Sequence, residues 1–180
     1  MKKILLFLLF SICLFSTSCA QEKTNPLEYQ TYPFFVEGSL VCDETEYNFT
    51  LSMKDASNSE ISFSSPDTLR GYTFNVTPDG TTLTYDDMTI DFNSHEKTSL
   101  VRLIPSLFSL SPDNFISNEK TTMNSTEILI SKYSTDMGDI SVYLNLQTAT
   151  PLRFEGDGFY MDVLKFTPSS PSTPQPTEQP

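Results

Sequence analysis

Between residues 33 and 167 most of the chain alternates apolar and polar positions with a period of two, the signature of half-buried β-strands. The clearest run places Tyr47, Phe49, Leu51 and Met53 on one face and polar residues on the other. Similar runs predict strands within 35–42, 61–63, 72–77, 81–85, 88–92, 127–133, 140–146, 151–155 and 159–166. Turn residues at 78–80 and 156–158 predict tight hairpins, so the strands should be mostly antiparallel.

The period changes once, between residues 99 and 110. Leu100, Leu103, Ile104, Leu107 and Phe108 recur at the spacing that places them on one face of a helix. A proline removes a backbone donor and is poorly tolerated deep inside a helix, and Pro105 lies in this run. We therefore expect a short helix or two, with Pro105 near the start of the second.

A sheet that is apolar on one face must curl or be covered, and one short helical stretch is too small to cover this many strands. The pattern therefore predicts a mainly β domain over 33–167: a curved antiparallel sheet that forms an incomplete barrel. The short helical segment should pack in its concave face.

The N-terminus has the pattern of an export signal. A cationic start, Met1-Lys2-Lys3, precedes an apolar stretch over 4–15 and small residues around Cys19. This resembles the bacterial lipoprotein signal, although Ser16 stands where that family usually has leucine. The resemblance implies cleavage after residue 18 and lipidation (palmitate) of Cys19. The alternative is an ordinary cleaved signal that leaves Cys19 unmodified.

The flanking segments follow from this interpretation. Residues 1–18 are the predicted signal peptide, and the polar stretch 19–32 is the lipidated N-terminus and tether. Residues 168–180 are rich in proline, serine and threonine and are predicted to be a disordered tail. The protein should be lipid-anchored on the extracytoplasmic face of a bacterial cell membrane, because two or more acyl chains anchor a protein stably.

Charge and composition narrow the possible functions. The net charge is −12, and it becomes −14 without the predicted signal, which contains two lysines and no acid. So acidic a chain is not expected to bind nucleic acid. A single histidine, His95, leaves little for a zinc site or a histidine-based hydrolase, and no nucleophile motif is present. We expect no cofactor, no metal and no enzymatic activity.

The remaining polar groups have simple structural interpretations. Asp86-Asp87 and Asp91 lie near His95 and Glu96 in sequence, but their spacing fits no twelve-residue calcium loop, so a solvated turn is favoured. Glu37 is expected to face outward from the first strand. Cys42 should be a small buried apolar residue; the alternative is a disulfide between two chains.

The order of elements resembles the LolA/LolB family of lipoprotein-localisation factors. Residues 35–40 and 47–51 look like the opening hairpin of that family, residues 62–74 like the crossing that follows, and residues 77–85 like its strand-turn-strand. The resemblance covers about residues 33–166 and implies a half-barrel whose hollow is lidded by helices and holds acyl chains. Clostridial spore-germination lipoproteins of that fold are also similar, and there the domain is a partner for a cell-wall amidase.

Two functional hypotheses follow. In the first, the apolar helical face is a movable lid over a hollow that binds an acyl chain or another lipid; in the simpler alternative it is a fixed part of the core. The residues expected to line the hollow are Phe49, Leu51, Phe63, Phe74, Tyr85, Ile90, Phe92, Leu100, Leu103, Ile104, Leu107 and Phe108. In the second, exposed strand edges or the acidic surface bind a protein of the cell envelope.

Overall fold

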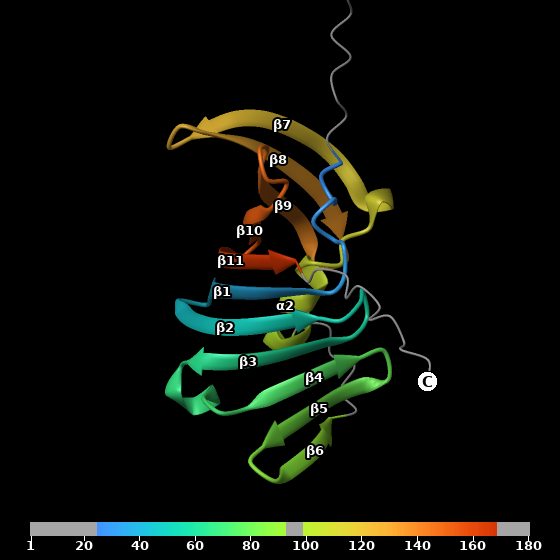
Figure 1. Cartoon of the computed structure of the whole chain (residues 1–180), viewed down its shortest axis with the longest axis vertical. Coiled ribbons are helices and arrows are strands. Elements are labelled where there is room, and N and C mark those ends of the chain that lie inside the picture. The colour runs from blue at the N-terminus through green and yellow to red at the C-terminus, as the bar shows by residue number, and fades with distance from the viewer. Residues whose placement is uncertain (1–24, 93–98, 169–180) are drawn as a thin grey trace, which may run out of the picture.

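The computed structural model describes residues 25–92 and 99–168 (Figure 1). The described strands are β1 (Phe34–Cys42), β2 (Thr45–Met53), β3 (Ser59–Ser65), β4 (Thr73–Thr77), β5 (Gly80–Tyr85), β6 (Met88–Phe92), β7 (Phe115–Met123), β8 (Thr126–Thr135), β9 (Gly138–Asn145), β10 (Pro151–Gly156) and β11 (Phe159–Pro168). The helices are α2 (Leu100–Leu107) and the 3-10 turns η1 (Asp67–Leu69) and η2 (Pro112–Asn114).

All eleven strands belong to one antiparallel sheet in the order β6-β5-β4-β3-β2-β1-β11-β10-β9-β8-β7. Neighbours in the sheet are neighbours in the chain, except that β1 pairs with β11 at the centre. The sheet bends strongly at the β8–β10 end and is not closed, since β6 and β7 form its two edges (Figure 1). This confirms the expected fold, a curved antiparallel sheet that forms an incomplete barrel.

One face of the sheet is apolar throughout its central strands. In β1, Phe34, Val36 and Leu40 are buried and alternate with partly exposed residues. The strand register continues this face in both directions: Val36 lies opposite Leu51, and Leu51 lies opposite Ile61. Because each strand alternates in the same phase, the buried side chains gather on the concave side of the sheet.

The helix α2 packs into that concave face, behind β1 and β2 in the view of Figure 1. One short helix forms here, as one of the two alternatives expected; the placement of Pro105 near the start of a second helix was wrong, because Pro105 lies inside this eight-residue helix. Proline removes only one hydrogen bond there, and the helix ends two residues later, at Leu107. The Ser106 hydroxyl donates to the Leu103 carbonyl at 2.7 Å, which satisfies one of the last carbonyls.

The folded unit begins earlier than the sequence suggested. Residues 25–32 were assigned to the tether, but Leu27 and Tyr29 are buried in the core. The polar composition of this stretch concealed its two large apolar side chains, which pack on α2 and on the central strands. The Tyr29 ring, for example, meets Phe108 and Phe154 edge-on, with centroids 6.4 and 6.3 Å apart.

Strand β7 was not predicted at all. All nine of its residues are exposed, including Phe115, Ile116 and Met123. An edge strand that is covered on neither face has no alternating burial, so the two-residue period that reveals a strand in sequence is absent. The two-residue turn at Asn124-Ser125, where both residues have positive φ, holds β7 against β8.

Gly38 allows a close approach within the sheet, and it generates a first prediction. A Cβ at this position would lie 2.6 Å from Cζ of Phe49 and 2.9 Å from the Asp162 carbonyl oxygen. We expect Gly38→Ala to lower the free energy of unfolding in urea by about 1–3 kcal/mol through overpacking. Gly38→Ala combined with Phe49→Leu should recover part of that loss; strictly additive effects of the two substitutions would contradict this explanation.

Candidate functional site

The candidate site is the concave face of the sheet together with α2. Of the residues predicted to line a hollow, nine gather in one apolar cluster there: Phe49, Leu51, Phe63, Phe74, Leu100, Leu103, Ile104, Leu107 and Phe108. Tyr85 and Ile90 lie on the same face but at its β6 edge, where they are 37% and 49% exposed. For Phe92 only the backbone position in β6 is described.

The centre of the concave face is filled by α2 itself. Ile104, Leu107 and Phe108 are completely buried. Phe108 packs against Phe34 and Phe154, with ring centroids 5.7 and 4.9 Å away. In this state α2 occupies the place that the sequence assigned to an apolar ligand, so a ligand could reach the central floor only if the helix moved.

Side-chain contacts hold α2 in place, rather than strong helix-forming features of its own. Ser99 makes no side-chain capping bond, and no charged residue complements the helix dipole at either end. At the C-terminal end, the Tyr32 hydroxyl donates to the Phe108 carbonyl at 3.0 Å and Gln30 Nε2 donates to the Leu110 carbonyl at 3.1 Å. An isolated helix of this length is unstable in water, so packing supplies most of its stability.

A cleft of about 370 Å³ lies along one side of α2. It is bounded by the helix, the turn after β2, the β4–β5 turn and the turn before β9. We call it the α2 cleft; its lining residues are Met53, Ala56, Ser57, Ser59, Val76, Thr77, Pro78, Arg102, Pro105, Ser106, Ser109, Asp136 and Met137. The volume falls within the usual range for small-molecule sites.

A second pocket, of about 450 Å³, lies between the N-terminal segment and the β7 edge. We call it the β7 pocket; its lining residues are Asn25, Pro26, Leu27, Pro112, Phe115, Asn118 and Tyr133. Phe115 and Tyr133 meet edge-on, with centroids 5.9 Å apart. Open space therefore remains in two places, beside α2 and at the β7 edge.

Several buried polar atoms around these spaces have no hydrogen-bond partner. In the described part of the chain they are the hydroxyls of Tyr29, Ser59, Ser131 and Tyr133 and the Nη2 atom of Arg102. Ser59 and Arg102 line the α2 cleft, and Tyr133 lines the β7 pocket. An unpaired buried polar group is costly, so its position marks a place where water or a ligand can bind.

Burial also changes the acidity of the two tyrosines. It raises the pKa of Tyr133 from 10.0 to about 12, because the phenolate would lose its hydration. For the same reason the pKa of Tyr29 is raised still further. Both hydroxyls therefore stay protonated at neutral pH and can donate a hydrogen bond.

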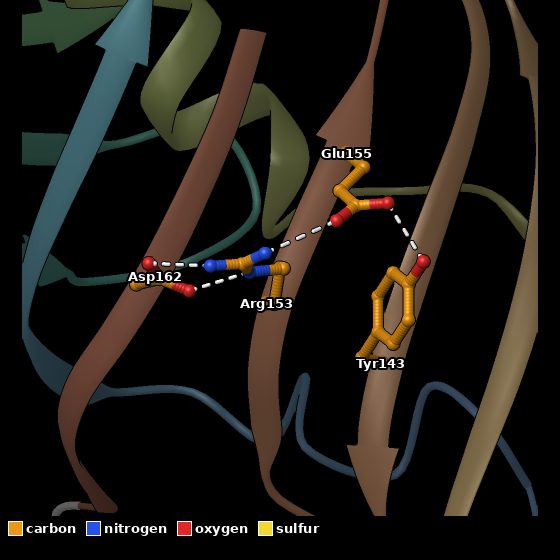
Figure 2. A network of polar contacts seen from close by, with 4 residues as sticks. All are labelled: Tyr143, Arg153, Glu155 and Asp162. Atoms are coloured by element: carbon orange, nitrogen blue, oxygen red, sulfur yellow. Dashed lines mark hydrogen bonds and ion pairs between the residues drawn. The ribbon is translucent and has the colours of Figure 1, made fainter. Parts of the chain in front are cut away.

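The outer, convex face carries a polar network that the sequence analysis missed (Figure 2). Arg153 on β10 forms a bidentate pair with Asp162 on β11, at 2.6 and 2.8 Å. Arg153 also contacts Glu155 at 3.3 Å, and Glu155 accepts a hydrogen bond of 2.7 Å from Tyr143 on β9. The hairpin register around residues 156–158 places Arg153 opposite Asp162, so this pair could have been found from the sequence.

Each group in the network is satisfied by a neighbour. The Asp162 carboxylate raises the pKa of Arg153, and the hydrogen bond to Glu155 raises the pKa of Tyr143. These charges neutralise one another across three strands on an open surface, which favours a role in fixing strand register over a role in chemistry.

The other polar residues considered in the sequence analysis make contacts that have a structural explanation. Glu37 forms an ion pair with Lys165 at 2.9 Å on the outer face. Asp91 accepts a hydrogen bond from Thr82, and Asp86 lies in the β5–β6 turn with positive φ. Cys42 is a free, partly exposed thiol, and its pKa is raised by burial and by Asp43. Among the described residues no group of His, Cys, Asp and Glu is arranged to hold a metal.

Some predicted residues fall outside the part of the chain that the structure describes. These are Cys19 with the signal and the first part of the tether, His95 and Glu96, and residues 169–180. Within residues 25–92 and 99–168, no helix has the length and apolar character needed to cross a membrane.

Comparison with known proteins identifies the fold. No protein-family model matches the chain, and no curated protein is similar in sequence. A solved structure of an uncharacterised conserved protein from Thermus thermophilus aligns with 80% of this chain and 83% of its own, with a TM-score of 0.53 and 12% identity. That likeness establishes a shared fold and carries no information about function.

Weaker structural likenesses include a LolA superfamily protein from Nitrosomonas europaea and the MucA/MucB complex of Pseudomonas aeruginosa. The first aligns with 81% of this chain and 92% of its own at a TM-score of 0.45 and 8% identity. The second aligns with 80% of this chain and 54% of its own at a TM-score of 0.45 and 9% identity.

The buried Tyr133 hydroxyl generates a prediction about pH. An unfolded chain loses the Tyr133 proton near 10.0, whereas the folded chain holds it to about 12. Between these values the unfolded state binds fewer protons, so the free energy of unfolding should fall as pH rises. Tyr133→Phe should reduce that fall.

At neutral pH, Tyr133→Phe should leave stability unchanged or raise it by about 1 kcal/mol, because it removes an unpaired buried hydroxyl. Urea denaturation of both proteins at neutral and alkaline pH measures this. A loss of several kcal/mol at neutral pH would show that the hydroxyl has a stabilising partner.

Proposed function

We propose that this protein is a non-enzymatic binding lipoprotein that takes up an apolar group, such as an acyl chain, against the concave face of its half-barrel. In this proposal Cys19 is lipidated and holds the protein on the extracytoplasmic face of a bacterial cell membrane. The tether then allows the domain to meet ligands at or near that membrane.

The observation that carries the proposal is the way in which α2 covers the concave face. Within the described residues, a single eight-residue α-helix, which contains Pro105, covers the apolar face of an eleven-stranded sheet. Its buried side chains contribute only packing, and open space remains beside the helix in the α2 cleft and at the β7 edge in the β7 pocket. Burial of apolar surface contributes roughly 25 cal/mol per Å², whichever apolar group is buried. An acyl chain that buried the same surface could therefore compete with the helix.

The arrangement of polar groups in the described residues supports a binding role over a catalytic one. The largest polar network, around Arg153, lies on the outer face, away from both spaces. The spaces themselves are lined by apolar residues, several hydroxyls, two asparagines, one arginine and one aspartate, and a mainly apolar lining with a few polar groups is usual for a ligand pocket.

A second candidate function is a scaffold that binds an envelope protein through a sheet edge. Strand β7 favours it: the strand is exposed along its whole length, and Phe115, Ile116 and Met123 are 44%, 50% and 46% exposed. An unpaired edge of this kind can accept an extended strand from another protein. A cell-wall hydrolase is the partner that the resemblance to spore-germination lipoproteins implies.

Uptake of an acyl chain is tested with a chain that starts at residue 20, which retains every described residue. A fluorescent fatty-acid probe should bind this protein saturably and be displaced by unlabelled fatty acid. If α2 must move, Tyr32→Phe should tighten binding by about fivefold, because it removes one hydrogen bond of about 1 kcal/mol that holds the closed state.

Tyr143→Phe is the matched control. It makes the same chemical change and breaks the hydrogen bond to Glu155 on the outer face, so it should leave probe affinity unchanged. No saturable binding by the unsubstituted protein would reject the proposal. Equal effects of the two substitutions would reject the movement of α2.

Membrane attachment is tested separately by Cys19→Ala in the full chain, expressed in a bacterium that processes lipoproteins. The unsubstituted protein and the control Cys42→Ala should sediment with membranes, whereas Cys19→Ala should be found in the soluble fraction or remain uncleaved. Membrane sedimentation of a cleaved Cys19→Ala protein would show that lipid on Cys19 is not the anchor.

A further inference from the structure

We propose that the α2 cleft binds the anionic head group of a single-chain amphiphile, with Arg102 and Ser59 as the donors. This inference rests on the proposed function and assigns the ligand class more narrowly, as a fatty acid or a closely similar monoanion. Its apolar tail would follow the apolar wall of the cleft toward the concave face.

Arg102 is the first donor. It lies in the first turn of α2, lines the cleft, and has a buried Nη2 atom with no hydrogen-bond partner. The other two arginines of the chain are matched by carboxylates: Arg70 by Asp67 at 2.6 Å, and Arg153 by Asp162 at 2.6 Å. In a chain of net charge −12, a partly buried guanidinium without a carboxylate partner among the described residues is unusual.

Ser59 is the second donor. It begins β3, is 4% exposed, and its hydroxyl makes no hydrogen bond. It lies on the concave face between Met53 and Val76, its register partners on β2 and β4. Both donors therefore border the same space, one from the helix and one from the sheet.

Three other hydroxyls of the cleft are already used within the protein. Ser106 donates to the Leu103 carbonyl, Ser109 donates to the Ala56 carbonyl, and Thr77 donates to the Gly80 carbonyl. Asp136 also lines the cleft and has an interaction of its own. Arg102 and Ser59 are thus the two cleft residues with a buried donor atom left over for a ligand.

The chemistry of these donors selects the head group. A guanidinium has donors and no acceptor, so it binds carboxylate or phosphate oxygens and rejects cations. Part of the remaining lining, formed by Met53, Val76, Pro105 and Met137, is apolar and suits an alkyl chain. A volume of about 370 Å³ is at the small end for a ligand site, which favours one chain over a two-chain lipid.

The test compares three amphiphiles of equal chain length: laurate, dodecanol and dodecyltrimethylammonium, each kept below the concentration at which it forms micelles. Affinities are measured by displacement of the fluorescent fatty-acid probe at about pH 8, where laurate is ionised. A charge-assisted hydrogen bond supports at least about tenfold tighter binding of laurate than of dodecanol. The cationic amphiphile should bind most weakly.

Arg102→Gln should abolish the preference for laurate and leave dodecanol affinity within about twofold. Arg70→Gln, which removes the same charge from an exposed site away from the cleft, should keep the preference. Ser59→Ala should reduce the preference by severalfold and serves as the second variant if Arg102→Gln does not fold.

The outcomes separate this inference from the function on which it rests. Equal binding of laurate and dodecanol by the unsubstituted protein overturns the head-group site and leaves apolar uptake intact. A preference that survives in both Arg102→Gln and Ser59→Ala also overturns it, because the anion is then held elsewhere. Failure of all three amphiphiles to bind overturns the proposed function itself.

Discussion

The packing of α2 against the concave face is the interaction on which the rest of the structure depends. An eleven-stranded sheet with one apolar face is unstable in water unless that face is covered, and it does not close on itself here. Three completely buried side chains of the helix, Ile104, Leu107 and Phe108, lie at the centre of that cover. The same helix forms the boundary of the α2 cleft, so stability and ligand access depend on one element.

The N-terminal segment couples to this packing. Leu27 and Tyr29 extend the apolar core, and Gln30 and Tyr32 bind the carbonyls at the end of the helix. The segment that precedes the first strand, and that would lead back to the membrane anchor in the proposed function, therefore contacts the helix that would have to move. A force on the N-terminal segment, or a change in its packing, would therefore directly change the stability of α2 on the concave face.

The sequence revealed those features that depend on a repeated pattern. The central strands, the hairpin at residues 156–158 and the apolar face of α2 all follow from periodicity, and all are present. Strand β7 has no such pattern because both of its faces are exposed, and it could not be seen. The burial of Leu27 and Tyr29 could not be predicted either, since two apolar residues in a polar stretch do not form a repeated pattern.

The candidate site shows the same division. The apolar lining residues near the helix were identified correctly as sharing one face, because alternation and helical spacing define a face. Arg102 and Ser59 were missed, because what distinguishes them is a buried donor atom without a hydrogen-bond partner. Hydrogen-bond partners depend on which elements meet in space, and the sequence does not show this directly. Tyr85 and Ile90 share the face but lie beyond the reach of an eight-residue helix, which sequence spacing does not indicate.

The most direct test of the account is native-state hydrogen exchange of the α2 amides, compared with those of the central strands β1 and β11. A helix held mainly by displaceable packing should open more readily than the central strands, and so exchange faster. Addition of laurate should change the exchange of α2 and leave β1 and β11 unaltered. Exchange of α2 that is as slow as that of the central strands, and unchanged by saturating laurate, would contradict the account and identify the helix as a fixed part of the core.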